Sequence, residues 1–193
     1  MAWLVAGLGN PGERYAHTRH NVGRMVVEQL ARDGGARFRK VRFIPADLAE
    51  VHHGGERALL VRSTLYMNES GTSYAGIAKK QHVEPERVIA VHDEIELPPG
   101  TIRVKLGGGN AGHNGLRSLQ SALRTPDFHR IRLGVGRPPG RQDPSDYVLA
   151  PISRRDEADL ALLVDRAADA VRSLFTDGLP ATQERFNGAA PGL

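Results

Sequence analysis

Three short apolar runs of strand length, each followed by a polar loop rich in glycine, asparagine or proline, constrain the fold of this chain most. They cover residues 4–6, 59–61 and 88–91. The loop after the first run leads into a helix, because Val22, Val26 and Leu30 recur at the spacing of one helix face, and Thr18 or Asn21 can cap it. Strands that alternate with helices predict an α/β layer structure.

Two further segments alternate polar and apolar residues, as half-buried strands do. They are residues 101–106, with Arg103 and Lys105 on one face, and residues 130–135. A hairpin-like stretch of this kind predicts a sheet that is not purely parallel. Helices are expected to end near Lys80 and Arg124, and a last helix, from about Arg154 to Phe175, closes the domain. We predict one domain over residues 1–193, a twisted mixed β-sheet flanked by helices.

The loop after the first run has the Gly-x-Gly-x-x-Gly spacing of a dinucleotide-binding turn, in residues 7–12. Such a turn opens directly into a helix that receives the pyrophosphate. Here Pro11 lacks an amide hydrogen and residues 10–12 favour a turn. Glu28 stands where the ribose-binding acid belongs, but it lies inside the predicted helix. A dinucleotide enzyme therefore remains only an alternative, and no cofactor is expected.

Several classes of protein are disfavoured by composition. The chain has no cysteine, which excludes disulfides and thiol nucleophiles. Its 8 histidines lack metal-ligand spacing, so no metal site is expected. The apolar run at the N-terminus is too short for a signal peptide or a membrane span. We expect a soluble, cytoplasmic protein.

Positive charge is concentrated in one segment. Residues 101–141 carry 8 basic and 1 acidic side chains, whereas the whole chain has a net charge of +4. Such a block is the expected footprint of a phosphate-bearing partner. The alternative is a solvated face balanced by the acidic C-terminal helix.

Unusual polar residues occupy the loops that follow the strands, where ligands bind in open α/β sheets. They are Asn10, His20, Asn68, Asp93 and Asn114, with Tyr15, Tyr66 and Met67 as possible walls. This set holds one histidine, one carboxylate and several neutral amides, but no evident nucleophile. Each asparagine taken alone could be a turn residue or a helix cap, and Met67 could be ordinary core.

Five blocks of sequence resemble the motifs of the bacterial peptidyl-tRNA hydrolase family, in the family's order and across nearly the full length. They are residues 10–12, 18–23, 66–71, 92–94 and 107–118. The resemblance implies an esterase that cuts the bond between a peptide and the 3′ end of its tRNA. Tyr66 stands where Phe is more often expected, and residues 137–146 and 182–187 match less well.

The resemblance and the chemistry of the residues imply the same roles. His20 is the general base that activates water, and Asp93 orients its ring and stabilises the imidazolium. Asn10 helps to separate blocked from free aminoacyl groups, while Asn68 and Asn114 hold the substrate or polarise its carbonyl and the water. Tyr15 and Tyr66 could stack on the terminal adenosine, and Met67 packs beside the site.

The basic segment then has a candidate partner in the tRNA of peptidyl-tRNA. Arg103, Lys105, Arg130 and Arg132 could clamp its phosphates without reading sequence. The protein is expected to act as a monomer. The main alternative is a catalytically silent relative that only binds RNA, which has no need of a polarised histidine.

Overall fold

A seven-stranded sheet forms the centre of the computed structural model, which describes residues 1–188. The strand order is β2-β3-β4-β1-β5-β7-β6. The strands are β1 (Ala2–Gly7), β2 (Arg39–Lys40), β3 (Ala46–His53), β4 (Glu56–Ser63), β5 (Val88–Glu94), β6 (Ile102–Leu106) and β7 (His129–Gly134). The central four, β4, β1, β5 and β7, run parallel, and the outer strands pair antiparallel to their neighbours.

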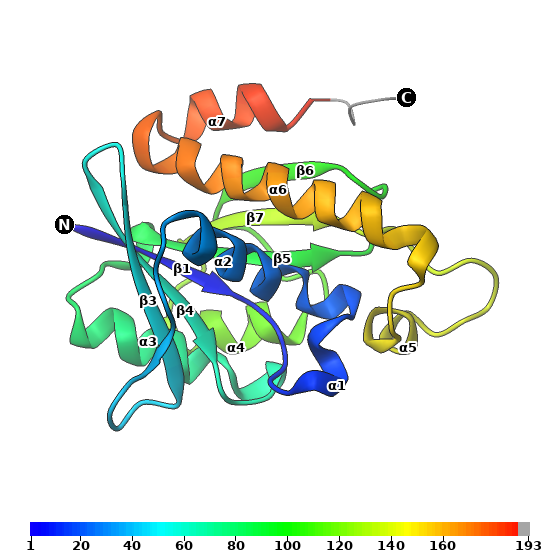
Figure 1. Ribbon diagram of the computed structural model, residues 1–193, viewed down its shortest axis with the longest axis horizontal. Helices are drawn as coiled ribbons and strands as arrows, with labels where there is room; N and C mark the ends of the chain where they lie inside the picture. Colours follow the sequence, from blue (N-terminus) through cyan, green and yellow to red (C-terminus); the bar gives the residue numbers. More distant parts are fainter. Residues whose placement is uncertain (189–193) are drawn as a thin grey trace.

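Helices cover both faces of the sheet (Figure 1). The helices are α1 (Glu13–Ala16), α2 (Val22–Asp33), α3 (Gly71–Lys80), α4 (Asn114–Leu123), α5 (Pro144–Leu149), α6 (Arg154–Thr176) and α7 (Leu179–Phe186), with 3-10 turns η1 (Arg19–Asn21), η2 (Met67–Glu69) and η3 (Pro85–Arg87). Alternation along β1 shows how the layers form: Val5 packs under α2 and α6, whereas Leu4 and Ala6 pack under α3 and α4. Both faces are buried, which is why the central strands are almost continuously apolar.

This architecture confirms the predicted fold class, a mixed sheet flanked by helices. The alternating segments at 101–106 and 130–135 pair as the antiparallel strands β6 and β7. The expectation that the helix from Arg154 closes the domain was wrong, because α7 follows it and packs beside β6. Strands β2 and β3 were not predicted from the sequence, and part of the proline-rich stretch after Gly136 folds as α5.

Close packing explains the glycines of the loop after β1. A Cβ on Gly7 would lie 2.8 Å from the carbonyl oxygen of Gly23 in α2, and one on Gly9 would lie 2.9 Å from Cβ of Arg24. These glycines therefore let α2 approach the loop.

The predicted capping of α2 by Thr18 or Asn21 was wrong. Neither side chain caps a helix: Asn21 Oδ1 accepts from the backbone N–H of Asn10 at 2.8 Å, and its Nδ2 donates to the Asn10 carbonyl at 2.9 Å. Asn21 thereby holds the glycine loop in place. Among residues 1–188, no helix has the length and apolar character needed to cross a membrane.

Candidate active site

Polar side chains converge where the parallel strands end. The loop after β1 carries Asn10, and η2 after β4 carries Asn68. Asp93 is the last residue but one of β5, and the glycine-rich loop after β6 leads to Asn114 at the start of α4. Strands β1, β4 and β5 run parallel, so the loops after them lie at the same end of the sheet. Strand β6 runs antiparallel and its last residue pairs with the first residue of β7, so the glycine-rich loop starts at the opposite end and runs back until His113 contacts Asp93.

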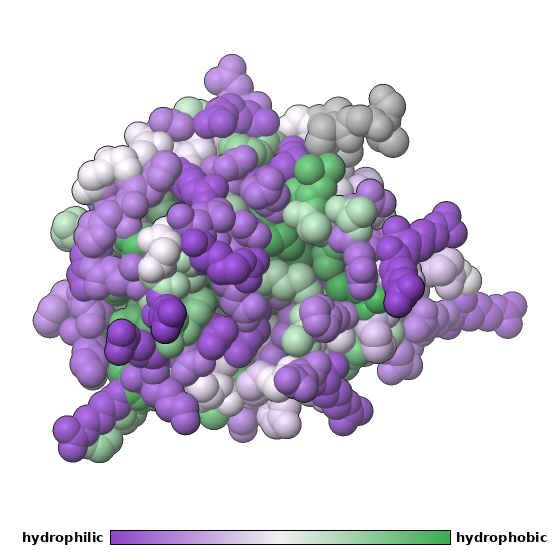
Figure 2. Space-filling view, viewed as in Figure 1, coloured by the Kyte–Doolittle hydropathy of each residue, from purple (hydrophilic) through white to green (hydrophobic). Residues whose placement is uncertain are grey.

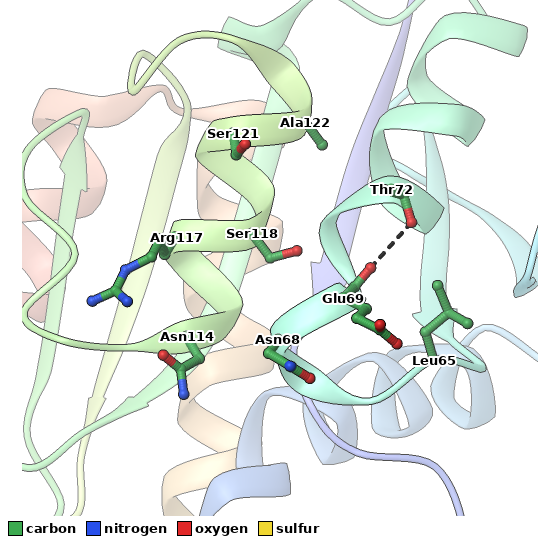
Figure 3. A pocket seen from close by; sticks show the side chains of 9 residues that line it. All are labelled: Leu65, Asn68, Glu69, Thr72, Asn114, Arg117, Ser118, Ser121 and Ala122. Atoms are coloured by element: carbon green, nitrogen blue, oxygen red, sulfur yellow. Dashed lines mark hydrogen bonds between the residues drawn. The ribbon is translucent and has the colours of Figure 1, made fainter.

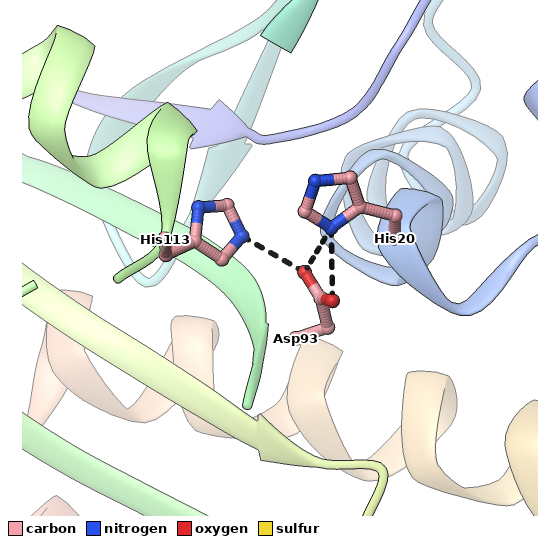
Figure 4. A group of neighbouring side chains, drawn as sticks. All are labelled: His20, Asp93 and His113. Atoms are coloured by element: carbon pink, nitrogen blue, oxygen red, sulfur yellow. Dashed lines mark hydrogen bonds and ion pairs between the residues drawn. The ribbon is translucent and has the colours of Figure 1, made fainter. Parts of the chain in front are cut away.

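Asp93 is the centre of the site (Figure 4). Its carboxylate is 4% exposed and accepts a hydrogen bond from His20 Nδ1, 2.9 Å from Oδ2 and 3.1 Å from Oδ1. On its other side, His113 Nε2 donates to Oδ1 at 2.9 Å. Burial raises the pKa of Asp93, but the charges and hydrogen bonds of the two histidines lower it by more, so this pKa lies well below its ordinary value.

The hydrogen bond to Asp93 determines which nitrogen of His20 can act as a base. An ionised carboxylate only accepts, so the Nδ1 of His20 carries the proton and its Nε2 keeps a free lone pair. Figure 4 shows this second nitrogen on the side of the ring away from Asp93. Burial lowers the pKa of His20, but the charge of Asp93 and its hydrogen bond raise it by more, so this pKa lies above its ordinary value. The arrangement can take up a proton at Nε2 and stabilise the imidazolium.

His113 is a site residue that the sequence reasoning missed. Its Nδ1 accepts hydrogen bonds from the backbone N–H groups of Gly115 and Leu116, at 3.1 and 3.3 Å, and so caps α4. Its position directly before a helix was a usable signal for a cap, but nothing along the chain showed its contact with Asp93. His113 thus connects the start of α4 to the carboxylate that orients His20.

The same three residues form the one group, within the described part of the chain, with the spacing of metal ligands. The hydrogen bonds of His113 disfavour that use. Its Nδ1 is an acceptor, so its Nε2 carries the proton and has no lone pair to give to an ion. The two histidines are therefore placed to donate hydrogen bonds to the Asp93 carboxylate and not to bind a metal ion.

A cavity of about 180 Å³ opens beside His20 and Asp93. Helix α5 forms one of its walls through Pro144, Ser145, Val148 and Leu149. This helix is tied to the segment that carries His20: the guanidinium of Arg19 lies 4.2 Å from the ring centroid of Tyr147 and 2.9 Å from Asp156 Oδ2. Part of the loop whose sequence matched the family less well therefore covers the candidate site.

A larger cavity, of about 820 Å³, lies between η2 with α3 on one side and α4 on the other (Figure 3). It is lined by Leu65, Asn68, Glu69, Thr72, Asn114, Arg117, Ser118, Ser121 and Ala122. Asn68 and Asn114 are exposed side chains that lie near each other, Asn68 on η2 and Asn114 at the start of α4. Asn114 also lines the smaller cavity beside His20, so it connects the two spaces.

Asn10 and Met67 hold the floor of the site together. Asn10 is 7% exposed, and its Oδ1 accepts a hydrogen bond from the backbone N–H of Met67 at 2.7 Å. Within residues 1–188, the Asn10 amide nitrogen donates to no protein group. The Met67 side chain is buried in the core under α3 and α4, as expected from the alternative interpretation that Met67 is an ordinary core residue. Asn10 therefore fixes η2, and with it Asn68, against the loop after β1.

Tyr15 and Tyr66 lie edge to face, with ring centroids 6.3 Å apart and planes at 84°. Tyr66 is 57% exposed and Tyr15 half-buried. The pair presents an aromatic surface near η2, with one ring largely free to contact a ligand.

The four basic residues of the predicted clamp share one face of β6 and β7, but they are not equivalent. Arg103 pairs in register with Arg132, and Lys105 with Arg130. Arg130 is fully buried: its guanidinium donates to the Gly109 carbonyl at 2.7 Å and also to Asn110 Oδ1 and the Pro126 carbonyl. A fully buried guanidinium is not accessible to a phosphate, so the prediction that Arg130 belongs to the clamp was wrong. Arg130 instead holds the glycine-rich loop in place.

Lys105 and Arg132 are half-buried beside a cavity of about 150 Å³. Burial and the neighbouring charges of Arg132 and Arg130 lower the pKa of Lys105. Arg132 Nη2 lies 3.1 Å from Glu94 Oε1, which offsets part of the local charge. This corner of the sheet retains a surplus of positive charge suited to an anion.

Comparison with known proteins identifies the family. Residues 4–192 match the family model described as "Peptidyl-tRNA hydrolase". The chain belongs to the peptidyl-tRNA hydrolase family. It is 50% identical to the peptidyl-tRNA hydrolase of Frankia alni, over 96% of this chain and 93% of that one. It is 47% identical to that of Arthrobacter sp., over 97% of each chain.

Solved structures extend the family likeness to three dimensions. The crystal structure of peptidyl-tRNA hydrolase from Acinetobacter baumannii superposes with a TM-score of 0.90 at 34% identity, covering 99% of this chain and 97% of that one. A 5′-methylthioadenosine nucleosidase from Arabidopsis thaliana, at 8% identity and a TM-score of 0.53, shares the fold alone. The chain is thus an enzyme of the peptidyl-tRNA hydrolase class, as its motifs predicted.

Proposed function

We propose that this enzyme hydrolyses the ester that joins a peptide, or an N-blocked aminoacyl group, to the 3′ end of tRNA, with His20 as the general base. The observation that carries the proposal is the hydrogen bond from His20 Nδ1 to Asp93 Oδ2, 2.9 Å long. It leaves the other ring nitrogen free beside a cavity that can hold water. The family supplies the substrate class.

The reaction needs no covalent intermediate, because an ester reacts with an activated water. Nε2 of His20 takes a proton from water as the oxygen attacks the ester carbonyl. The resulting imidazolium is stabilised by the carboxylate of Asp93. When the tetrahedral intermediate collapses, the bond to the 3′ oxygen of the tRNA breaks and that oxygen receives the proton. The products are free tRNA and a peptide with a free carboxyl group.

In this proposal the exposed asparagines bind the peptide. Asn68 and Asn114 both line the larger cavity, and each carries an amide donor and acceptor that can pair with a peptide main chain. Asn114 also lines the cavity beside His20. We therefore propose that its amide hydrogen-bonds the ester carbonyl that reacts or the attacking water.

We propose that Asn10 separates blocked from free aminoacyl groups. Its Oδ1 is already occupied by the Met67 N–H, so its amide nitrogen is the group that can donate to substrate. A free α-ammonium has no carbonyl for that donor, and an unpaired amide next to a desolvated charge disfavours binding.

The tRNA side of the substrate has two proposed contacts. Tyr66, with Tyr15 against its edge, can stack on the terminal adenosine. Lys105, Arg132 and Arg103 can contact backbone phosphates, whereas the buried Arg130 holds the glycine-rich loop. We further propose that the enzyme acts as a monomer, because one chain supplies every residue of the proposed site. We also propose that it acts in the cytoplasm.

The test is release of the amino acid from N-acetyl-aminoacyl-tRNA, beside unblocked aminoacyl-tRNA, without added metal. We expect rapid hydrolysis of the blocked substrate alone. If the protein bound tRNA but hydrolysed neither substrate, it would be a silent RNA-binding relative, and His20 and Asp93 would be structural.

A further inference from the structure

An exposed basic segment lies at the edge of the sheet farthest from β6 and β7. It consists of Arg37, Arg39, Lys40, Arg42 and Phe43, which we call the β2 basic edge. All five are exposed, and within residues 1–188 none of the four cations forms an ion pair. Neighbouring arginines differ, since Arg57 pairs with Glu50 and Arg62 with Asp47. The β2 basic edge therefore carries four charges that the fold itself does not use.

Phe43 is the most unusual member of this surface. Its side chain is 91% exposed, and its backbone has a φ of 66°, a left-handed conformation that bulky residues rarely adopt. The guanidinium of Arg42 lies 4.8 Å from its ring centroid. An exposed aromatic ring beside a cation, at the tip of a turn, is a feature that folding alone does not require.

The segment is nevertheless firmly attached to the protein. Phe38 packs on the core under α2 and lies 4.2 Å from the guanidinium of Arg62, while Val41 and Ile44 pack on the core under α3. The carbonyl of Pro45 accepts hydrogen bonds from the backbone of Thr64 and from the hydroxyl of Ser73. Apolar residues thus anchor the turn and leave its cations and Phe43 projecting.

The position of the turn relates it to the candidate active site. Ala46 pairs with Ser63, the last residue of β4, and Leu65 two residues later lines the larger cavity. The turn therefore lies at the same end of the strands as the site. Figure 2 shows hydrophilic side chains around hydrophobic atoms at the corner where this turn projects in Figure 1.

We propose that the β2 basic edge binds the phosphate backbone of tRNA outside its 3′ end, with Phe43 stacking on a base or ribose. This inference rests on the proposed function, because the substrate brings RNA to this end of the sheet. Charge at an edge strand also prevents aggregation, but an exposed phenylalanine would work against that purpose. Cations interleaved with an exposed aromatic ring suit RNA, which offers both phosphates and flat bases.

The size of the sheet makes this a second contact, separate from the β6–β7 corner. Seven strands about 4.8 Å apart place β2 roughly 29 Å from β6. A contact over that distance belongs to the body of the tRNA. Its contribution is therefore expected with whole tRNA and not with a short 3′ fragment.

The test compares two double variants of equal charge. Arg39→Gln with Lys40→Gln removes two charges from the surface, and Lys79→Gln with Lys80→Gln removes two exposed charges from the far end of α3. We expect the first pair to raise the Kd for deacylated tRNA roughly tenfold and to reduce its salt dependence, and the control pair to change neither. Phe43→Ala, which removes no charge, is expected to weaken binding about tenfold.

Hydrolysis gives an independent readout. The first pair should raise KM for N-acetyl-aminoacyl-tRNA without lowering kcat, and should leave KM for an N-acetyl-aminoacyl CCA oligonucleotide unchanged. Equal tRNA affinity of both double variants and of Phe43→Ala would overturn the proposal. It would also be overturned if the Arg39→Gln, Lys40→Gln variant kept its tRNA affinity but lost binding to phosphatidylserine vesicles, because the surface would then bind a membrane. The wild-type protein could also hydrolyse neither substrate while the Arg39→Gln, Lys40→Gln variant still binds tRNA more weakly. That result would support tRNA binding by the β2 basic edge and would contradict the proposed function.

Discussion

The carboxylate of Asp93 accepts the Nδ1–H of His20 at 2.9 Å, and it does so while buried to 4% exposure. A buried carboxylate that is ionised and hydrogen-bonded to two imidazoles is a fixed negative charge. It orients His20, raises the pKa of that ring and thereby determines how the enzyme should respond to pH and to mutation.

Replacing His20, the proposed base, should remove turnover and leave tRNA binding intact. We expect His20→Gln to lower kcat by about 10²- to 10⁴-fold, because the proton acceptor for water is lost. The Kd for deacylated tRNA should stay near the wild-type value, since His20 contacts no phosphate in the proposal. Single-turnover hydrolysis and tRNA binding by fluorescence anisotropy check this, and a variant with near-normal kcat would disprove the assignment of the base.

The pH dependence of kcat/KM should report the influence of Asp93. Only neutral His20 can take a proton, so activity falls as the pH drops through its pKa. Asp93 raises the pKa of His20 above its ordinary value, so the acidic limb of the wild-type profile should lie at a higher pH than that of an unperturbed histidine. Asp93→Asn should lower the activity and move the limb to lower pH. An unchanged midpoint in the variant would mean that another group controls the limb.

Acid should remove a part of the stability that Asp93 provides. The folded pKa of this carboxyl is depressed, so its contribution is present above the unfolded value of about 3.9 and is lost as the pH falls below it. We expect Asp93→Asn to be less stable than the wild type at pH 7, and the difference to shrink toward pH 3. Urea unfolding at several pH values measures it, with His82→Gln, outside the site, as a control.

The basic corner should contribute to binding more than to chemistry. We expect Lys105→Glu with Arg132→Glu to raise KM much more than it lowers kcat, because phosphate contacts act on the ground state and the transition state alike. The effect should decrease as salt rises. Steady-state kinetics at two salt concentrations test this, and wild-type KM at physiological salt would refute the clamp.

Arg130 should behave as a structural residue. Its guanidinium satisfies the Gly109 and Pro126 carbonyls from a fully buried position. Replacement by Met leaves these groups unpaired, and we expect it to lower the free energy of unfolding by about 2–3 kcal/mol. Arg103→Gln, at a half-buried position on the neighbouring strand β6, is the matched control and should change stability little. If Arg130→Met were as stable as that control while tRNA binding was lost, Arg130 would instead be a phosphate ligand.

Local patterns along the chain were enough to predict the fold class and most residues of the candidate site, although not His113. Apolar runs and polar alternation indicated the central strands and the β6–β7 pair, because the period of side chains along a strand follows from local geometry. The polar loops were expected to meet because ligands in open α/β sheets bind beyond the carboxyl ends of the strands. The loop after the antiparallel β6 meets the others only because it runs back toward Asp93. The motifs named the family.

Tertiary structure alone decided which of those residues touch and which are buried. His113 joins Asp93 because the loop before α4 folds back over the end of β5, a contact between elements 20 residues apart. Arg130 and Arg132 alternate identically along the chain, yet only the glycine-rich loop that closes over β7 buries Arg130. Side-chain burial and hydrogen bonding depend on packing between segments that are distant in the sequence. The local periodicity of a strand or helix does not contain this information.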